Sequence, residues 1–313
     1  MNLRLIGGLA LWLGFLAGPM GPGAEMEIAR ILALALLVVL PLGFDLSRRT
    51  GEASSNMFAA AKYLQPFAAV VVASSFFLPA GVLAGTLAIA WLPLTGLLAI
   101  DAFNRIRQRG LAPLEELAVD TAGLYLPVGA VWLWASRMGL EPFGFTEPIV
   151  LLTAVHFHFA GFGGPLLAGL TGRFLRSRDA DLPLLYTPSA ALVLIGPALV
   201  AAGFFLPPNF EALAAALLAA GYLGLSLVIL SGVVRPMGRS LPGLLLATSA
   251  LAVLFAMAAA TAYAVGNASR VFFIPIPTMV LVHGWLNAAG FVLLGLLGWA
   301  VKGVDTDQAG ANR

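Results

Sequence analysis

Residues 148–172 read PIVLLTAVHFHFAGFGGPLLAGLTG and are followed by Arg173. The stretch contains no Asp, Glu, Lys or Arg. As a helix rising about 1.5 Å per residue it is long enough to cross a hydrocarbon core of about 30 Å. Lipid offers the backbone no hydrogen bonds, and the stretch lacks the period-two alternation of a membrane barrel strand. It therefore predicts a membrane-spanning α-helix.

The rest of the chain repeats this pattern. Hydrophobic residues make up 60% of the 313 residues and charged residues 10%, whereas soluble proteins contain about 25% charged residues. We predict an all-α polytopic transmembrane helix bundle over residues 1–303 and a short, polar, disordered cytoplasmic tail over 304–313. The ten predicted spans lie at about residues 3–19, 27–46, 61–79, 81–102, 114–136, 148–172, 184–206, 210–234, 242–265 and 278–301.

The basic residues predict the orientation of these spans. Short loops rich in Lys and Arg stay in the cytoplasm, and the exit of every even-numbered span is basic. This pattern predicts that both termini are cytoplasmic. The basic residues at these exits are Arg48, Arg49, Lys62, Arg105, Arg107, Arg109, Arg173, Arg176, Arg178, Arg235, Arg239 and Lys302.

Composition also excludes several kinds of chemistry. The chain has no cysteine, which rules out disulfides, thiolate metal sites, iron–sulfur ligation and thiol catalysis. Its formal net charge of +2 comes from small clusters rather than from a basic patch, so we predict no nucleic-acid partner. The expected partners are membrane lipid and a lipid-soluble or other small-molecule substrate.

All three histidines of the chain, His156, His158 and His283, fall inside predicted spans. Burying an ionisable group in a membrane is costly, so such residues usually mark a site or a pathway. Spans six and ten run in the same direction, which places all three in the outer half of the bilayer, where one pocket can receive them. The sequence does not establish that they converge, and a nonfunctional hydrogen bond between helices is the alternative for each.

The spacing of these residues constrains what they can share. His156 and His158 are two positions apart and point about 200° apart on a regular helix, so they do not form a zinc-protease pair. His283 and Asn287 are four apart and share one face, where the amide can orient the imidazole or contact the same substrate. We predict His156, His158, His283 and Asn287 as catalytic residues.

Asp120 is the carboxylate that completes this predicted set. It lies about a turn and a half inside span five. A buried aspartate can carry a proton, or it can pair with Lys62 or with an arginine. The sequence leaves both roles open.

Residues 156–159, HFHF, resemble the tenth-helix motif of the catalytic subunit of heme-copper oxidases, in which a His-Phe-His run ligates two hemes from opposite faces. That family needs more histidines than this chain has, so a complete heme-copper centre is excluded. A single bis-histidine heme, with one ligand from His156 or His158 and one from His283, stays open, as does a metal ion. The cofactor is unknown at this point.

Two segments, residues 156–162 (HFHFAGF) and 283–291 (HGWLNAAGF), resemble the YndJ-like family of bacterial membrane proteins. The resemblance extends over the whole chain. It implies a multi-pass protein of the bacterial cytoplasmic (inner) membrane and implies no particular reaction.

Three functions fit these observations. The favoured one is an enzyme or redox protein whose histidine-centred intramembrane site acts on a lipid-soluble substrate. The second is a proton-coupled secondary transporter or flippase, although the parallel histidine spans do not suggest an inverted repeat. The third is a structural or assembly subunit whose polar residues serve helix packing.

Overall fold

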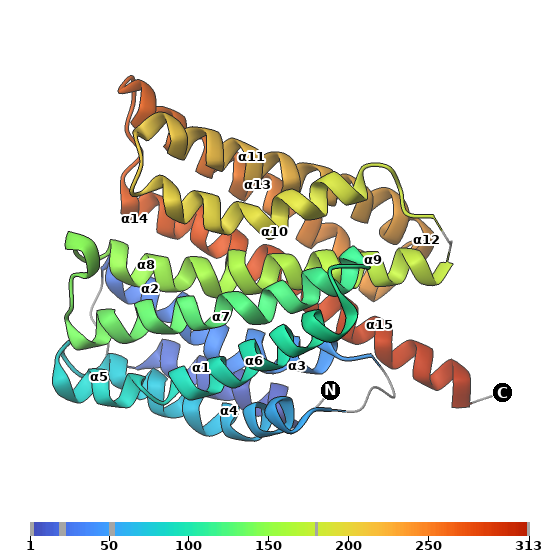
Figure 1. Ribbon diagram of the computed structural model, residues 1–313, viewed down its shortest axis with the longest axis horizontal. Coiled ribbons are helices and arrows are strands. Elements are labelled where there is room, and N and C mark those ends of the chain that lie inside the picture. The colour runs from blue at the N-terminus through green and yellow to red at the C-terminus, as the bar shows by residue number, and fades with distance from the viewer. Residues whose placement is uncertain (1–2, 19–22, 50–53, 179–180, 312–313) are drawn as a thin grey trace. The chain divides into compact units, whose positions relative to one another are not determined.

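The computed structural model describes residues 3–18, 23–49, 54–178 and 181–311 (Figure 1). Within these ranges all regular structure is helical, which confirms the predicted fold class. Nine helices in the described part are long and apolar enough to cross a membrane, and Arg4–Ala17 is a shorter apolar helix. The nine are Ala24–Ser47, Asn56–Phe77, Val82–Arg109, Leu114–Met138, Ile149–Arg178, Tyr186–Gly203, Asn209–Met237, Leu241–Ser269 and Ile276–Gly303.

Several spans consist of more than one helical element. The elements before the middle of the chain are α1 Leu3–Ala17, α2 Ala24–Leu34, η1 Ala35–Val39, α3 Leu40–Ser47, α4 Asn56–Ser74, η2 Ser75–Phe77, α5 Val82–Ala88, α6 Trp91–Arg109, α7 Leu114–Met138, η3 Pro142–Gly144, α8 Ile149–His156 and η4 Phe157–Gly163. Those that follow are α9 Gly164–Arg178, α10 Tyr186–Gly203, α11 Pro208–Val228, η5 Ile229–Val234, α12 Arg235–Met237, α13 Leu241–Ser269, α14 Ile276–Met279, η6 Val280–Gly284, η7 Leu286–Leu293 and α15 Leu294–Ala311.

The chain divides into two compact units. Unit 1 comprises residues 1–112 and 120–163, and unit 2 comprises residues 113–119 and 164–313. The division into a bundle over residues 1–303 and a tail over 304–313 stays a prediction, and the last helix, α15, spans Leu294–Ala311. Residues 312 and 313 of the predicted tail lie outside the described residues.

Unit 1 is built around the span from α2 to α3. Most side chains from Ile28 to Phe44 are buried, and this span packs against α1, α4 and α8. The Trp12 indole Nε1 on α1 donates to the Arg30 carbonyl oxygen at 3.1 Å. The predicted first span is therefore a short helix that packs within this unit.

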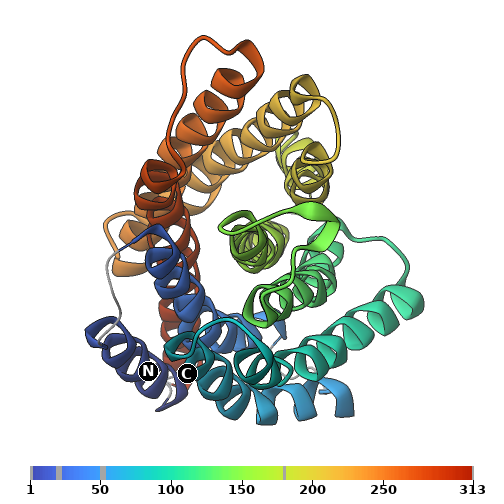
Figure 2. The ribbon, with the colours of Figure 1, turned by 90° about the vertical axis from the view of Figure 1, so that its left-hand side faces the viewer.

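Unit 2 is organised around α13. This helix packs against α11 on one side and against η7 and α15 on another. Figure 2 shows α11 (gold) and α13 (orange) next to each other. The last helical segment, from α14 to α15, thus has α13 as its main neighbour within the unit.

In the part of the chain that the structure describes, five segments adopt the wider π-helical geometry, in which the backbone hydrogen bond runs from residue i to i+5. A proline stands one residue beyond the start of the α-helix that follows η1, η4 and η5, at Pro41, Pro165 and Pro236. Proline has no N–H and clashes with the carbonyl four residues earlier, which in each case lies inside the π segment. The prolines therefore explain why these three segments leave α geometry where they do.

Candidate functional site

His158 lies in η4 and is fully buried in unit 1. Its Nδ1 is 2.7 Å from the Ala154 carbonyl oxygen, and its Nε2 is 2.9 Å from the Nε1 of Trp91 on α6. A carbonyl oxygen only accepts and an indole N–H only donates, so Nδ1 carries the proton and Nε2 accepts. Both ring nitrogens of His158 are thus engaged within the protein.

The environment of His158 is tightly packed. The Trp91 and His158 rings are stacked with centroids 6.2 Å apart. A Cβ atom added at Gly129 on α7 would lie 2.7 Å from His158 Nδ1, which is closer than Cβ atoms come to a non-bonded neighbour. Glycine at position 129 therefore lets α7 approach the imidazole, and the site leaves no room for a ligand on that side.

His156 is the last residue of α8, directly before the π segment η4. It is half-buried and meets the Phe157 ring edge-on, with centroids 5.2 Å apart. The expected angle of 200° between His156 and His158 assumes a regular α-helix, and the π segment that begins at Phe157 changes that geometry.

His283 lies in η6 of unit 2 and is half-buried. Its Nδ1 is 2.8 Å from the carbonyl oxygen of Ala256 on α13, so Nδ1 carries the proton of the neutral ring. Its Nε2 has no hydrogen-bond partner in the described part of the chain. This is the arrangement by which a backbone carbonyl fixes an imidazole and leaves the second nitrogen available as a base or ligand.

Asn287 lies in η7, one turn beyond His283, and is buried. Its Oδ1 is enclosed yet has no hydrogen-bond partner among the described residues. The helix is anchored to α13 on both sides of Asn287, by His283 to Ala256 and by Ser249 Oγ to the Phe291 carbonyl oxygen at 2.7 Å. Asn287 therefore sits between two fixed points with an unmet hydrogen-bonding group.

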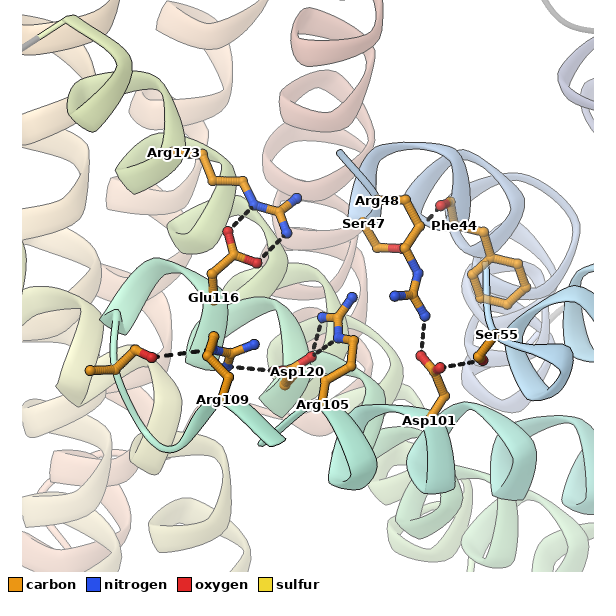
Figure 3. A network of polar contacts seen from close by, with 11 residues as sticks. Phe44, Ser47, Arg48, Ser55, Asp101, Arg105, Arg109, Glu116, Asp120 and Arg173 are labelled. Carbon is orange, nitrogen blue, oxygen red and sulfur yellow. Dashed lines mark hydrogen bonds and ion pairs between the residues drawn. The ribbon is translucent and has the colours of Figure 1, made fainter. Parts of the chain in front are cut away.

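Asp120 is fully buried near the start of α7, in unit 1, and binds two arginines (Figure 3). Its Oδ1 accepts from Nε and Nη2 of Arg105, and its Oδ2 accepts from Nη2 of Arg109 at 2.7 Å. Nearby in the same unit, Asp101 accepts from Arg48 and from the hydroxyl of Ser55. Of the two roles left open by the sequence, the structure shows Asp120 in ion pairs with arginines.

Unit 2 has its own ion pairs at the first turn of α7. Glu116 accepts two hydrogen bonds from Arg173, each of 2.7 Å, as Figure 3 shows. Glu115 accepts from Arg176 Nε at 2.7 Å. Arg173 and Arg176 thus each form an ion pair with a glutamate of α7.

The predicted site residues are thus divided between the two units. His156, His158 and Asp120 belong to unit 1, and His283 and Asn287 belong to unit 2. No group of three or more His, Asp or Glu residues in the described part of the chain is placed to hold a metal ion. Sequence reasoning missed Trp91 as the partner of His158, because the two residues are 67 positions apart and nothing in the sequence links them.

Comparison with known proteins gives two matches. The family model for YndJ-like protein matches residues 30–291. The uncharacterized membrane protein YndJ of Bacillus subtilis (strain 168) is 29% identical over 292 residues, which are 93% of this chain and 51% of that protein. This chain therefore spans about half the length of the curated relative it matches.

No solved structure matches the chain. The nine long apolar helices and the membrane relative make it an integral, multi-pass membrane protein. Because the family model covers most of the chain, this protein belongs to the YndJ-like family.

Proposed function

We propose that the protein binds a lipid-soluble small molecule at His283 and Asn287, and that His283 exchanges a proton with it. The observation that carries this proposal is the hydrogen bond from His283 Nδ1 to the Ala256 carbonyl oxygen, because it leaves Nε2 as a lone-pair acceptor. His283 is the base, and Asn287 is the polar group that positions the bound molecule. The activity is acid–base catalysis in the outer half of the bacterial cytoplasmic membrane.

The amide of Asn287 supports a ligand at this place. A buried polar group without a partner costs about 1–3 kcal/mol, and a ligand that hydrogen-bonds to it recovers that cost. The imidazole Nε2 lone pair and the amide Oδ1 both accept hydrogen bonds, so together they suit a molecule that carries two O–H donors. A hydroquinone or another lipid-soluble diol or diphenol has this chemistry.

The surroundings of His283 support an approach from lipid. Its neighbours Leu281 and Val282 are exposed, at 57% and 45%, and Phe255, next to Ala256 on α13, is 68% exposed. These apolar side chains face away from the packed interior of the unit. A substrate that dissolves in the bilayer can therefore reach the level of His283 without crossing a polar surface.

Redox chemistry on a heme receives less support from this geometry. Ligation of iron by His158 would require Trp91 to give up its hydrogen bond to Nε2 and would leave a buried indole N–H without an acceptor. We therefore assign His158 a structural role and place the chemistry at His283.

Proton-coupled transport is the second candidate, and one observation favours it. Five π segments lie within the helices of the described residues, and His283 and Asn287 lie in two of them. Local π segments within helices are frequent at functional sites, and ionisable side chains within membrane spans mark proton relays in transporters. In that case His283 carries the coupled proton.

The test compares the small molecules that co-purify with the protein. Organic extracts of detergent-purified wild type, His283→Leu, Asn287→Leu and His156→Leu are analysed by liquid chromatography and mass spectrometry, with thermal unfolding as the check on folding. We expect a lipid-soluble species in wild type that is lost from His283→Leu and Asn287→Leu and kept in His156→Leu, the matched histidine control. Identical extracts from all four proteins would contradict the proposal.

A further inference from the structure

Two basic side chains from different helices of unit 2 meet at one aromatic ring. The ring is that of Phe174 on α9, and its centroid lies 5.7 Å from the Cζ of Arg178 and 4.9 Å from the Nζ of Lys302 on α15. Both distances are within the range of cation–π contacts, about 6 Å. Helices α9 and α15 are neighbours within the unit. The ring of Phe174 therefore brings together two positive charges from two helices.

Arg178 differs from the two arginines that precede it on α9. Arg173 and Arg176 each form an ion pair with a glutamate of α7. The side chain of Arg178 is exposed and has neither an ion pair nor a hydrogen bond with any described residue. Its N–H groups are therefore available to a ligand.

The α15 side of this cluster adds further N–H donors. The ammonium group of Lys302 has three of them, so it can donate to a ligand in addition to its contacts within the protein. Trp299 lies one turn before Lys302, and its ring packs against Phe174 with centroids 5.6 Å apart. The indole Nε1 of Trp299 is enclosed and has no acceptor among the described residues. A cluster of donors of this kind favours a ligand rich in acceptor oxygens.

The cluster lies at the ends of two membrane spans. The span Ile149–Arg178 ends at Arg178 itself, and the span Ile276–Gly303 ends one residue after Lys302. The charge pattern predicts that both ends face the cytoplasm, and tryptophan is enriched at the depth of the lipid headgroups. The two cations therefore lie where the phosphates of the inner leaflet are expected.

We propose that Arg178 and Lys302 bind the phosphate of an anionic phospholipid of the inner leaflet, with Phe174 holding the two side chains together. The planar N–H donors of arginine fit phosphate oxygens, and the lysine ammonium adds a point charge. Two positive charges at one ring repel each other, and a phosphate that contacts both stabilises the pair. Basic pockets between membrane helices on the cytoplasmic side bind the headgroups of anionic lipids. The position at two span ends favours a lipid over free phosphate, because a lipid carries its phosphate to this depth.

The test is a lipid titration of the detergent-purified protein with native mass spectrometry as the readout. Wild type, Arg178→Gln, Lys302→Gln and Arg239→Gln are each titrated with phosphatidylglycerol and with phosphatidylcholine, and thermal unfolding checks that each variant is folded. Arg239 is the matched control, because it lies in the same unit, is exposed, is predicted to be cytoplasmic and has no ion-pair partner in the described part of the chain. A competition with inorganic phosphate distinguishes the lipid from the free anion.

We expect wild type to prefer phosphatidylglycerol, and Arg178→Gln and Lys302→Gln each to bind it about fivefold more weakly, as fits the loss of one cation near a membrane surface. Binding of phosphatidylcholine should not change, and Arg239→Gln should behave as wild type. The proposal is overturned by equal binding of the two lipids to wild type, by wild-type affinity in Arg178→Gln or Lys302→Gln, or by an equal loss in Arg239→Gln. Displacement of phosphatidylglycerol by inorganic phosphate would also overturn it, because the site would then recognise the free anion.

Discussion

At the scale of single residues, His158 and His283 differ in the state of their second ring nitrogen. Both donate from Nδ1 to a backbone carbonyl, of Ala154 and Ala256 respectively. Only His158 also accepts a hydrogen bond at Nε2, from Trp91. The same residue type therefore serves as a packing element in one unit and as the proposed base in the other.

The structural role of His158 predicts a loss of stability in Trp91→Phe. This change removes the donor to His158 Nε2 and leaves a buried acceptor unmet, at a cost of about 1–3 kcal/mol in the free energy of unfolding. Denaturant unfolding in detergent measures it. The control is Trp132→Phe, which makes the same substitution at another tryptophan. The Trp132 ring lies against the rings of Phe143 and Phe145 rather than against a histidine. Equal free energies of unfolding for the two variants would contradict the structural role of His158.

At the scale of elements, ion pairs connect the first turns of α7 to other helices. Asp120 binds Arg105 and Arg109 of α6, and Glu116 binds Arg173 of α9. Asp120 is fully buried, so water does not stabilise its negative charge, and the positive charges of Arg105 and Arg109 do so instead. The contacts of α7 therefore depend on these charges as well as on apolar packing.

Removal of the Asp120 carboxylate should lower the free energy of unfolding strongly. Asp120→Ala leaves two largely buried guanidinium groups without their anion, and we expect a loss of about 3–5 kcal/mol in the free energy of unfolding. The more exposed pair of Lys62 with Asp45 is the control, since Asp45→Ala should cost at most about 1 kcal/mol. Thermal and denaturant unfolding of both variants checks the difference, and similar losses would refute it.

At the scale of the whole molecule, the sequence predicts the helices far better than the contacts between them. Ten predicted spans correspond to nine long apolar helices and the shorter α1 in the described part of the chain, because apolar run length dictates what can cross lipid. The π segments were not predicted, although Pro41, Pro165 and Pro236 mark three of them. The Trp91–His158 pair depends on tertiary packing, which no local pattern encodes.

The candidate site was predicted only in part. His283 and Asn287 were chosen for their spacing and their place in a span, and the structure adds the Ala256 carbonyl that fixes the imidazole. That carbonyl belongs to the backbone, so residue types in the sequence cannot predict that it accepts the hydrogen bond. The convergence of the three histidines stays a prediction, since His158 and His283 belong to different compact units.

Single-cysteine variants can test the topology that the charge pattern predicts, because the chain itself contains no cysteine. Leu184 and Val271 are 95% and 80% exposed in loops predicted to lie on opposite sides of the membrane. On intact cells a membrane-impermeant maleimide should label Val271→Cys, and Leu184→Cys should react only after lysis. The reverse pattern would place both termini outside.

The most direct test of the central claim is the reactivity of the histidines toward diethyl pyrocarbonate, which acylates an unprotonated imidazole nitrogen. The intact protein is treated in detergent at neutral pH, and peptide mass spectrometry locates the modified residues. We predict rapid modification of His283, whose Nε2 is available, and protection of His158, whose ring nitrogens are both hydrogen-bonded. Protection of His283 together with modification of His158 would contradict the account.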